Sequence, residues 1–167
     1  EIMELARMQK DFKKLNTAIF VLSTDGLNSH IQWVKSLEGI DCADGNIPKI
    51  EFPIISDVDM SISKKYGMLD KDTTNPKNVR AVFIIDDNNK VKAIFYYPSQ
   101  VGRNMDEIKR TLIALQTTDS EGILTPVNWN PGEDYMVPSP TTIEESKEYM
   151  ASAKNIADTI FLVSPNT

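Results

Sequence analysis

The chain has 167 residues, of which 41% are hydrophobic and 25% are charged, and its 18 basic and 24 acidic residues give a formal net charge of -6. This length and composition suit one globular domain followed by a tail. The acidic balance argues against nucleic acid and anionic membrane surfaces as partners, because both attract basic proteins. No apolar run approaches the roughly 20 residues that a membrane-crossing helix needs.

The chain has one cysteine, Cys42, and one histidine, His30. A single cysteine cannot form an internal disulfide, which favours a reducing compartment, and we expect the cytoplasm. The two residues are too far apart in sequence for a dedicated zinc site, so no metal is expected. No phosphate-binding or dinucleotide-binding glycine pattern occurs, and we expect no cofactor.

Residues 1–15 predict an amphipathic helix, because Ile2, Leu5, Met8 and Phe12 recur at helical spacing. No capping residue and no initiating methionine precede this helix. We therefore expect that its start has been lost, the alternative being a frayed terminal helix.

Short strands and helices are expected to follow. The predicted elements are a strand at 18–23, a turn and cap at 25–28, a helix at 29–39, a strand at 52–56 and a short helix at 59–66. The first strand is continuously apolar, which is typical of a strand covered on both faces. The second is expected at a sheet edge, because Pro53 cannot donate to a ladder, and Gly67 is expected to end the short helix.

Residues 81–85 and 91–97 flank the turn-forming residues 86–89 and predict a buried antiparallel hairpin. Arg80 enters this hairpin and Arg103 follows it. Two guanidinium groups beside a buried hairpin are costly unless an anion lies between them. The sequence therefore predicts an anionic group at this place.

Asn104 is expected to cap a long helix whose apolar face is formed by Met105, Ile108, Leu112 and Leu115. Beyond about residue 118 the chain is rich in proline, with one more helix expected at 143–150. Trp129 and Tyr135 must bury their rings against something, and we expect this tail to pack on a partner subunit. The alternative is a tail that wraps its own domain.

The order of these elements predicts an α/β fold with a mixed sheet, and a thioredoxin-like arrangement is one of several candidates. Seven segments narrow the choice: FKKLNTAIFVLSTD (12–25), HIQW (30–33), FPIISD (52–57), YGMLD (66–70), RAVFIID (80–86), YYPSQVGRNMDEIKRTLIALQ (96–116) and TPVNWNPGE (125–133). Together they resemble the one-cysteine branch of the peroxiredoxins, which are AhpC/TSA-like proteins. The most specific of these matches is YP-x3-GRN-x-DEI-x-R with TPVNW downstream.

The resemblance implies a thioredoxin-like mixed sheet flanked by helices in residues 1–118, and a C-terminal, dimer-associated peroxiredoxin extension in residues 119–167. It implies a thiol peroxidase that reduces hydrogen or organic peroxides through a cysteine sulfenate. The implied partners are an external thiol reductant, either glutathione or a thioredoxin-type protein, and a second copy in a homodimer.

In this family the peroxidatic cysteine stands in a P-x3-T-x2-C loop, typically followed by Thr-Thr-Glu, and no P-x3-T-x2-C occurs in these residues. Glu1 aligns with that glutamate, so the cysteine is expected to precede residue 1. The strand that precedes this loop in the family, between the strand at 18–23 and the hairpin, would also be missing. A chain limited to these residues is expected to fold poorly and to be inactive.

The resemblance gives three residues a role. Arg80 matches the arginine that stabilises the thiolate and orients the peroxide, and its five donors suit both tasks. Arg103 matches the arginine that holds the first-turn glutamate, and Glu1 as that glutamate would bridge both arginines. The alternatives are a surface ion pair for Arg80 and a helix-cap ion pair for Arg103.

Four other residues are not expected to be catalytic. Cys42 lies between Asp41 and Asp44, which would raise its pKa. His30 is expected to be a packed helix residue, and Trp33 and Trp129 core or interface anchors.

Two alternative functions stay open. One is a non-catalytic, degenerate thioredoxin-like interaction module. The other is a phospholipase activity, which some one-cysteine members show and which would need a Ser/His arrangement.

Overall fold

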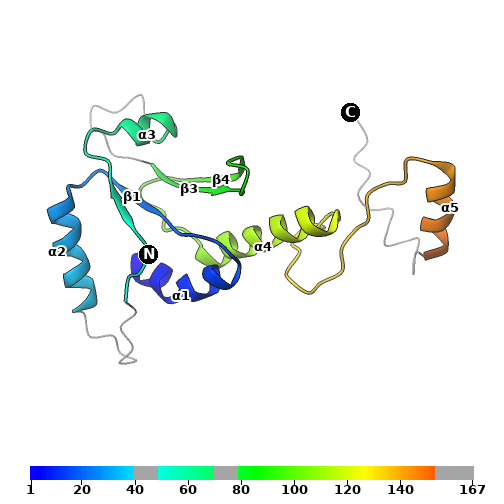
Figure 1. Ribbon diagram of the computed structural model, residues 1–167, viewed down its shortest axis with the longest axis horizontal. Coiled ribbons are helices and arrows are strands. Elements are labelled where there is room, and N and C mark those ends of the chain that lie inside the picture. The colour runs from blue at the N-terminus through cyan, green and yellow to red at the C-terminus, as the bar shows by residue number, and fades with distance from the viewer. Residues whose placement is uncertain (40–48, 70–78, 153–167) are drawn as a thin grey trace. The chain divides into compact units, whose positions relative to one another are not determined.

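A computed structural model describes residues 1–39, 49–69 and 79–152 of the chain (Figure 1). The chain forms two compact units, Glu1–Lys109 and Arg110–Thr167. The predicted division of the chain into a core, residues 1–118, and an extension, residues 119–167, stays a prediction. Cys42 lies outside the described residues.

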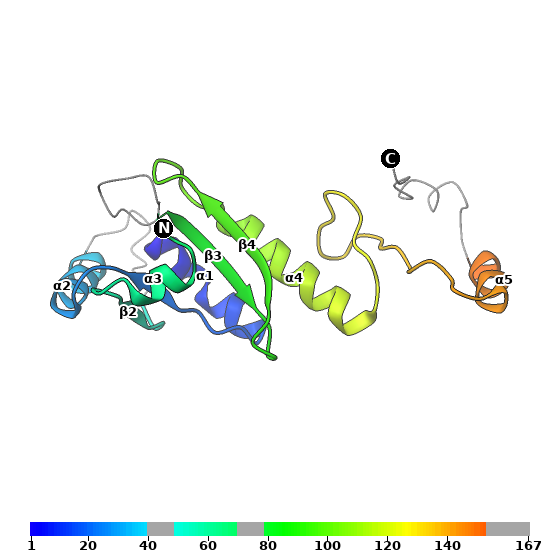
Figure 2. The same ribbon diagram turned by 90° about the horizontal axis from the view of Figure 1, so that it is seen from above.

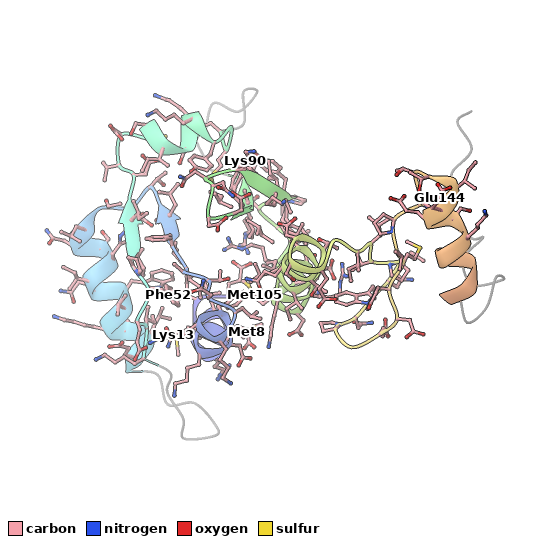
Figure 3. All side chains as sticks on the ribbon, turned by 45° about the vertical axis from the view of Figure 1, so that its right-hand side comes forward. Met8, Lys13, Phe52, Lys90, Met105 and Glu144 are labelled. Carbon is pink, nitrogen blue, oxygen red and sulfur yellow. The ribbon has the colours of Figure 1, made fainter. Side chains whose placement is uncertain are left out.

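The first helix, α1 (Ile2–Lys14), confirms the predicted amphipathic helix, with Ala6, Met8 and Phe12 buried. It ends because Asn16 adopts a left-handed conformation with φ 51°, which lets the N–H of Thr17 donate to the carbonyl of Phe12 at 2.9 Å. The interior of this unit also contains Phe52 from the segment that leads into β2. Met8 and Phe52 are both labelled in Figure 3.

Strands β1 (Val21–Ser23) and β2 (Ile54–Ser56) form a parallel pair in which Val21 lies opposite Ile54. The predicted edge position of β2 is confirmed, with the carbonyl of Pro53 accepting a hydrogen bond from Val21 N at 3.1 Å. The prediction that residues 18–23 form a strand covered on both faces is wrong. Phe20 is 67% exposed and lies before β1, which begins only at Val21.

Helix α2 (Leu27–Glu38) begins two residues earlier than predicted. Gly26 is its N-cap, whereas the carboxylate of Asp25 accepts a hydrogen bond from Ser23 Oγ at 2.8 Å and does not cap the helix. Helix α3 (Ser61–Lys65) confirms the predicted short helix, which ends near Gly67 at φ 65°. Its first turn is held by the buried carboxylate of Asp57, which accepts the backbone N–H groups of Ile62 and Ser63.

Strands β3 (Arg80–Ile85) and β4 (Val91–Tyr97) confirm the predicted antiparallel hairpin (Figure 2). Its loop closes through Asp86 N–H, which donates to the carbonyl of Lys90, and Asn89 takes the left-handed position that this turn requires. The expectation that the hairpin is buried is wrong. Helix α1 lies below the hairpin in Figure 1, and Ile94 and Tyr96 of β4 are about half exposed, at 48% and 51%.

The described strands form two separate two-stranded sheets, β1–β2 and β3–β4. The chain therefore contains both parallel and antiparallel pairing, as a mixed α/β fold requires. Among the residues that the structure describes, no strand lies between β1 and β3 to join the two pairs.

Helix α4 (Met105–Glu121) confirms the predicted cap, with Asn104 Oδ1 accepting a hydrogen bond from Glu107 N at 3.1 Å. Its predicted apolar face is confirmed by the burial of Ile108 and Leu112. Helix α5 (Ile143–Ser152) confirms the last predicted helix and starts with a capping box between Thr142 and Glu145.

Trp129 anchors the irregular segment of the second unit and is only 3% exposed. Its indole Nε1–H donates to the carbonyl of Glu133 at 3.1 Å, and Arg110 Nη1 donates to the carbonyl of Trp129 at 2.8 Å. Tyr135 remains exposed within the described chain. No helix in the described ranges has the length and apolar character needed to span a membrane.

Candidate active site

The side chains of Glu1, Arg80 and Arg103 meet in one cluster, although they come from three separate elements. Glu1 is the N-cap of α1, Arg80 is the first residue of β3, and Arg103 directly precedes the capping residue of α4. The N-terminus and the labels of β3 and α4 locate these elements in Figure 1. The structure thus brings together the three residues that the sequence predicts as site residues.

Arg103 grips the Glu1 carboxylate in a bidentate fashion. Its Nε donates to Glu1 Oε1 at 3.2 Å and its Nη2 to Oε2 at 3.1 Å, while its backbone N–H donates to Oε1 at 2.8 Å. The remaining guanidinium nitrogen, Nη1, donates to the carbonyl of Ala81 at 3.3 Å, next to Arg80 on β3. A planar fork of this kind fixes the orientation of both partners.

Arg80 approaches the same carboxylate from the other side, with its Nη1 3.0 Å from Glu1 Oε2. The side chain of Arg80 is 38% exposed, compared with 26% for Glu1 and 25% for Arg103. In the described part of the chain, Glu1 is the one acidic partner of Arg80. Two guanidinium groups and one carboxylate leave an excess positive charge, and Arg80 is the more accessible cation.

The environment of Glu1 sets its ionisation. Partial burial acts to raise the pKa of Glu1. This effect is outweighed by hydrogen bonds from the side chain and backbone of Arg103 and by the charges of Arg103 and Arg80. Together they lower the pKa from 4.5 to about 2. Glu1 is therefore a carboxylate across the physiological pH range. It acts as an anionic link between the arginines and has no proton to donate there.

A second ion pair, which the sequence did not predict, joins helices α1 and α4. Lys109 Nζ lies 2.7 Å from Asp11 Oδ2, and the charge and hydrogen bond of Lys109 lower the pKa of Asp11. Because α1 carries Glu1 and α4 follows Arg103, this pair supports the orientation of both. Each residue is an ordinary helix-surface charge, and no local pattern connects them.

His30 and Trp33, which were not expected to be catalytic, lie outside the arginine cluster. His30 is buried on α2, as predicted for a packed helix residue, and neither it nor Trp33 contributes to the arginine cluster. In the ranges 1–39, 49–69 and 79–152, no three His, Cys, Asp or Glu side chains gather into a group that could hold a metal ion.

What this cluster can do chemically follows from its charge. An exposed guanidinium beside a fixed anion stabilises a second anion placed next to it, and a nearby cation lowers the pKa of a thiol. The arrangement is suited to holding an anionic nucleophile or an oxygen atom on which negative charge develops.

Comparisons with known proteins place the chain in a family. Residues 1–94 match the AhpC/TSA family, and residues 114–152 match the C-terminal domain of 1-Cys peroxiredoxin. A peroxiredoxin of Methanosarcina mazei is 45% identical over 151 residues, which cover 90% of this chain and 69% of the relative. Peroxiredoxin 2 of Picrophilus torridus is 42% identical over 149 residues, which cover 87% of this chain and 69% of the relative.

Solved structures of peroxiredoxins are also similar to this chain. The yeast mitochondrial 1-Cys peroxiredoxin, whose thiol is resolved via glutathione/thioredoxin systems, superposes with a TM-score of 0.76 at 34% identity over 89% of this chain and 70% of its own. Peroxiredoxin 6 of Arenicola marina superposes with a TM-score of 0.77 at 34% identity, over 89% of this chain and 68% of its own.

These likenesses confirm the predicted thioredoxin-like fold with a C-terminal peroxiredoxin extension, and they define an enzyme of the thiol peroxidase class. The chain belongs to the peroxiredoxins, with the domain content of the 1-Cys type.

Proposed function

We propose that the intact protein reduces hydrogen or organic peroxides with a cysteine thiolate that is held beside Arg80. The observation that carries this proposal is the accessible guanidinium of Arg80, fixed by Glu1 next to Arg103. The nucleophile would be the cysteine of the P-x3-T-x2-C loop, which the family resemblance aligns just ahead of Glu1. The N-terminus of α1, where Glu1 lies, would then be next to the thiolate and add its favourable dipole.

In the proposed reaction the thiolate sulfur attacks one peroxide oxygen, and the O–O bond breaks. The sulfur becomes a sulfenic acid, and the departing oxygen takes a proton to leave as water or an alcohol. Arg80 would donate hydrogen bonds to the thiolate and to the peroxide oxygen that becomes negative. Arg103 and Glu1 would hold Arg80 in place and would not touch the peroxide.

The sulfenic acid must then be reduced. An external thiol attacks its sulfur and expels water to form a mixed disulfide, which a second thiol opens to regenerate the cysteine. We propose glutathione or a thioredoxin-type protein as this reductant, by analogy with the yeast 1-Cys relative. A cytoplasmic homodimer is part of the same proposal.

The test begins with the parent coding sequence and the protein expressed from it. We expect a P-x3-T-x2-C segment upstream of Glu1, and a second-order rate of peroxide consumption that falls about 10- to 100-fold in Arg80→Lys, because one charge-assisted hydrogen bond in the transition state is lost. Arg7→Lys, the same change on the exposed side of α1, is the matched control and should leave the rate unchanged.

The Arg80→Lys variant also tests whether this arginine stabilises the thiolate. Alkylation of the thiol as a function of pH should give a higher thiol pKa in Arg80→Lys than in the parent. A parent protein without the cysteine, or one whose rate is the same with Arg80→Lys, contradicts the proposal. The first of these results would favour the non-catalytic interaction module.

A further inference from the structure

A groove of about 340 Å³ lies between α2 and the segment that leads into β2. Leu27, Ile31 and Val34 line it from α2, where their spacing places them on one stripe of the helix, and Phe52 and Ile54 line it from the opposite side. The volume falls within the range of about 300 to 1,000 Å³ that small-molecule pockets occupy. The groove shares no residue with the Glu1, Arg80 and Arg103 cluster.

The α2 wall of this groove is not covered by other described residues. Leu27 is 64% exposed and Ile31 is 43% exposed, which is unusual for adjacent members of an apolar helix stripe. The opposite wall is better packed, since Phe52 is buried. The groove therefore offers an apolar surface that is open along one side.

His30 lies in the same wall and has an unsatisfied side chain. The residue is 4% exposed, and both ring nitrogens, Nδ1 and Nε2, are buried without a hydrogen-bond partner in the described structure. Buried polar side chains almost always have a partner, so an imidazole with none at either nitrogen calls for an explanation. Rotation about its Cβ–Cγ bond could turn one of these nitrogens toward the groove that the residue lines.

Lys35 brings a positive charge to this groove. It follows Ile31 by one helical turn, is exposed, and forms no ion pair with a described acidic residue. The Oε1 of Glu38 accepts a hydrogen bond at 3.3 Å from the backbone N–H of Ile50, which also lines the groove, so this carboxylate is held at the backbone of the opposite wall. An apolar groove with an imidazole in its wall and an ammonium group on its lining is complementary to an amphipathic anion.

We propose that this groove binds a small fatty carboxylate, with the hydrocarbon chain along Ile31, Val34 and Phe52 and the carboxylate between Lys35 and a turned His30 ring. Lys35 supplies the charge and His30 an N–H donor, so a carboxylate satisfies both groups. The hydrocarbon part covers the exposed stripe of α2. This binding function goes beyond peroxide reduction and does not depend on it.

The experiment uses octanoate as the probe and the single histidine of the chain as the reporter. The full chain, labelled with ¹⁵N, is titrated with octanoate while the imidazole nitrogen signals of His30 are followed. We expect a saturable shift of these signals as the ring gains a partner. The same titration with octanol, which has the same tail and no charge, should give an affinity lower by about tenfold.

Two variants and one control decide between a carboxylate site and a merely apolar groove. Lys35→Met keeps the length of the side chain and removes the charge, and it should weaken octanoate binding by about tenfold without changing octanol binding. His30→Phe should weaken octanoate binding as well. Lys90→Met, the same change at the hairpin turn (Lys90 is labelled in Figure 3), should bind as the parent does.

The proposal is overturned if saturating octanoate leaves the His30 signals in place, or if octanol and octanoate bind equally well. Equal octanoate affinities in Lys35→Met and Lys90→Met would overturn it too. Should His30→Phe fail to fold, the Lys35→Met comparison and the His30 signals of the parent still give the answer.

Discussion

At the scale of single residues, the carboxylate of Glu1 shows how opposing effects decide an ionisation state. Removing a carboxylate from water favours its neutral form, yet Glu1 receives three hydrogen bonds from Arg103 and an ion pair from Arg80. The bonds and charges outweigh the desolvation, so the pKa falls to about 2. A neutral residue of the same shape would leave two guanidinium groups facing one another.

We expect Glu1→Gln to lower the free energy of unfolding by about 1 kcal/mol near pH 6, a modest loss because the cluster is partly exposed to solvent. The pKa of Glu1 is depressed on folding, so its contribution is complete above pH 4.5 and is lost as the pH falls toward about 2. Urea unfolding at about pH 6 and about pH 3 should show the gap between parent and variant shrinking at the lower pH.

Glu4→Gln is the matched control for this prediction, because Glu4 pairs with Arg7 at 3.3 Å on the exposed side of the same helix. It should change stability by less than about 0.5 kcal/mol at either pH. A gap between parent and Glu1→Gln that stays the same at both pH values would contradict the assigned pKa.

Sequence reasoning reached the residues of this cluster through motifs, and it missed those that depend on long-range contacts. Arg80, Arg103 and Glu1 stand in recognisable segments. Asp11 and Lys109 form their ion pair across 98 residues, and the segment that contains Lys109 does not indicate which residue it pairs with. The burial of His30 was predicted, but its unsatisfied nitrogens were not, because satisfaction depends on neighbours that the sequence does not identify.

At the scale of elements, local signals located most helices and the hairpin. Asn104 predicted the start of α4, and the turn-forming residues 86–89 predicted the hairpin of β3 and β4, since caps and turns are set by neighbouring residues. The errors came where tertiary contacts decide. The predicted strand at 18–23 shortened to Val21–Ser23, because pairing with β2 and not apolar content sets its extent.

Trp129 offers a test of how the segment after α4 is held. Trp129→Phe removes the indole N–H that donates to Glu133 and part of a buried ring, and we expect it to lower the free energy of unfolding by about 1–2 kcal/mol. Trp33→Phe, at a side chain that is 42% exposed on α2, should change it by less than about 0.5 kcal/mol. Urea unfolding followed by circular dichroism compares the two, and equal losses would contradict the anchoring role of Trp129.

At the scale of the whole molecule, both units leave large apolar side chains exposed. Phe20 and Val58 are examples in the first unit, and Val127 and Tyr135 in the second. The mixed α/β character was predictable from the order of elements, whereas the separation of the strands into two sheets was not, because it depends on which strands are present to pair. Exposed apolar side chains on the extension agree with the predicted role of that segment in a dimer.

We therefore expect sedimentation equilibrium of the intact protein at micromolar concentration to give twice the mass of its monomer. Val127 is 77% exposed, and Val127→Glu should shift the equilibrium toward the monomer, because a buried unpaired carboxylate is costly. Val58→Glu, at an exposed valine of the first unit, is the control and should leave the dimer intact. A parent that sediments as a monomer would contradict the predicted homodimer.

The contact between Glu1 and Arg103 joins residues that are 102 positions apart, and this has a consequence for folding during synthesis. Helix α1 is synthesised before the residues that hold it: Arg80 follows with β3, and the last partners, Arg103 and Lys109, follow only after β4. At about 5–20 residues per second, α1 waits about 5–20 s for these partners. Closing so long a loop comes late in folding, so the arginine cluster is expected to be among the last parts of the molecule to assemble, and a nascent chain cannot acquire it early.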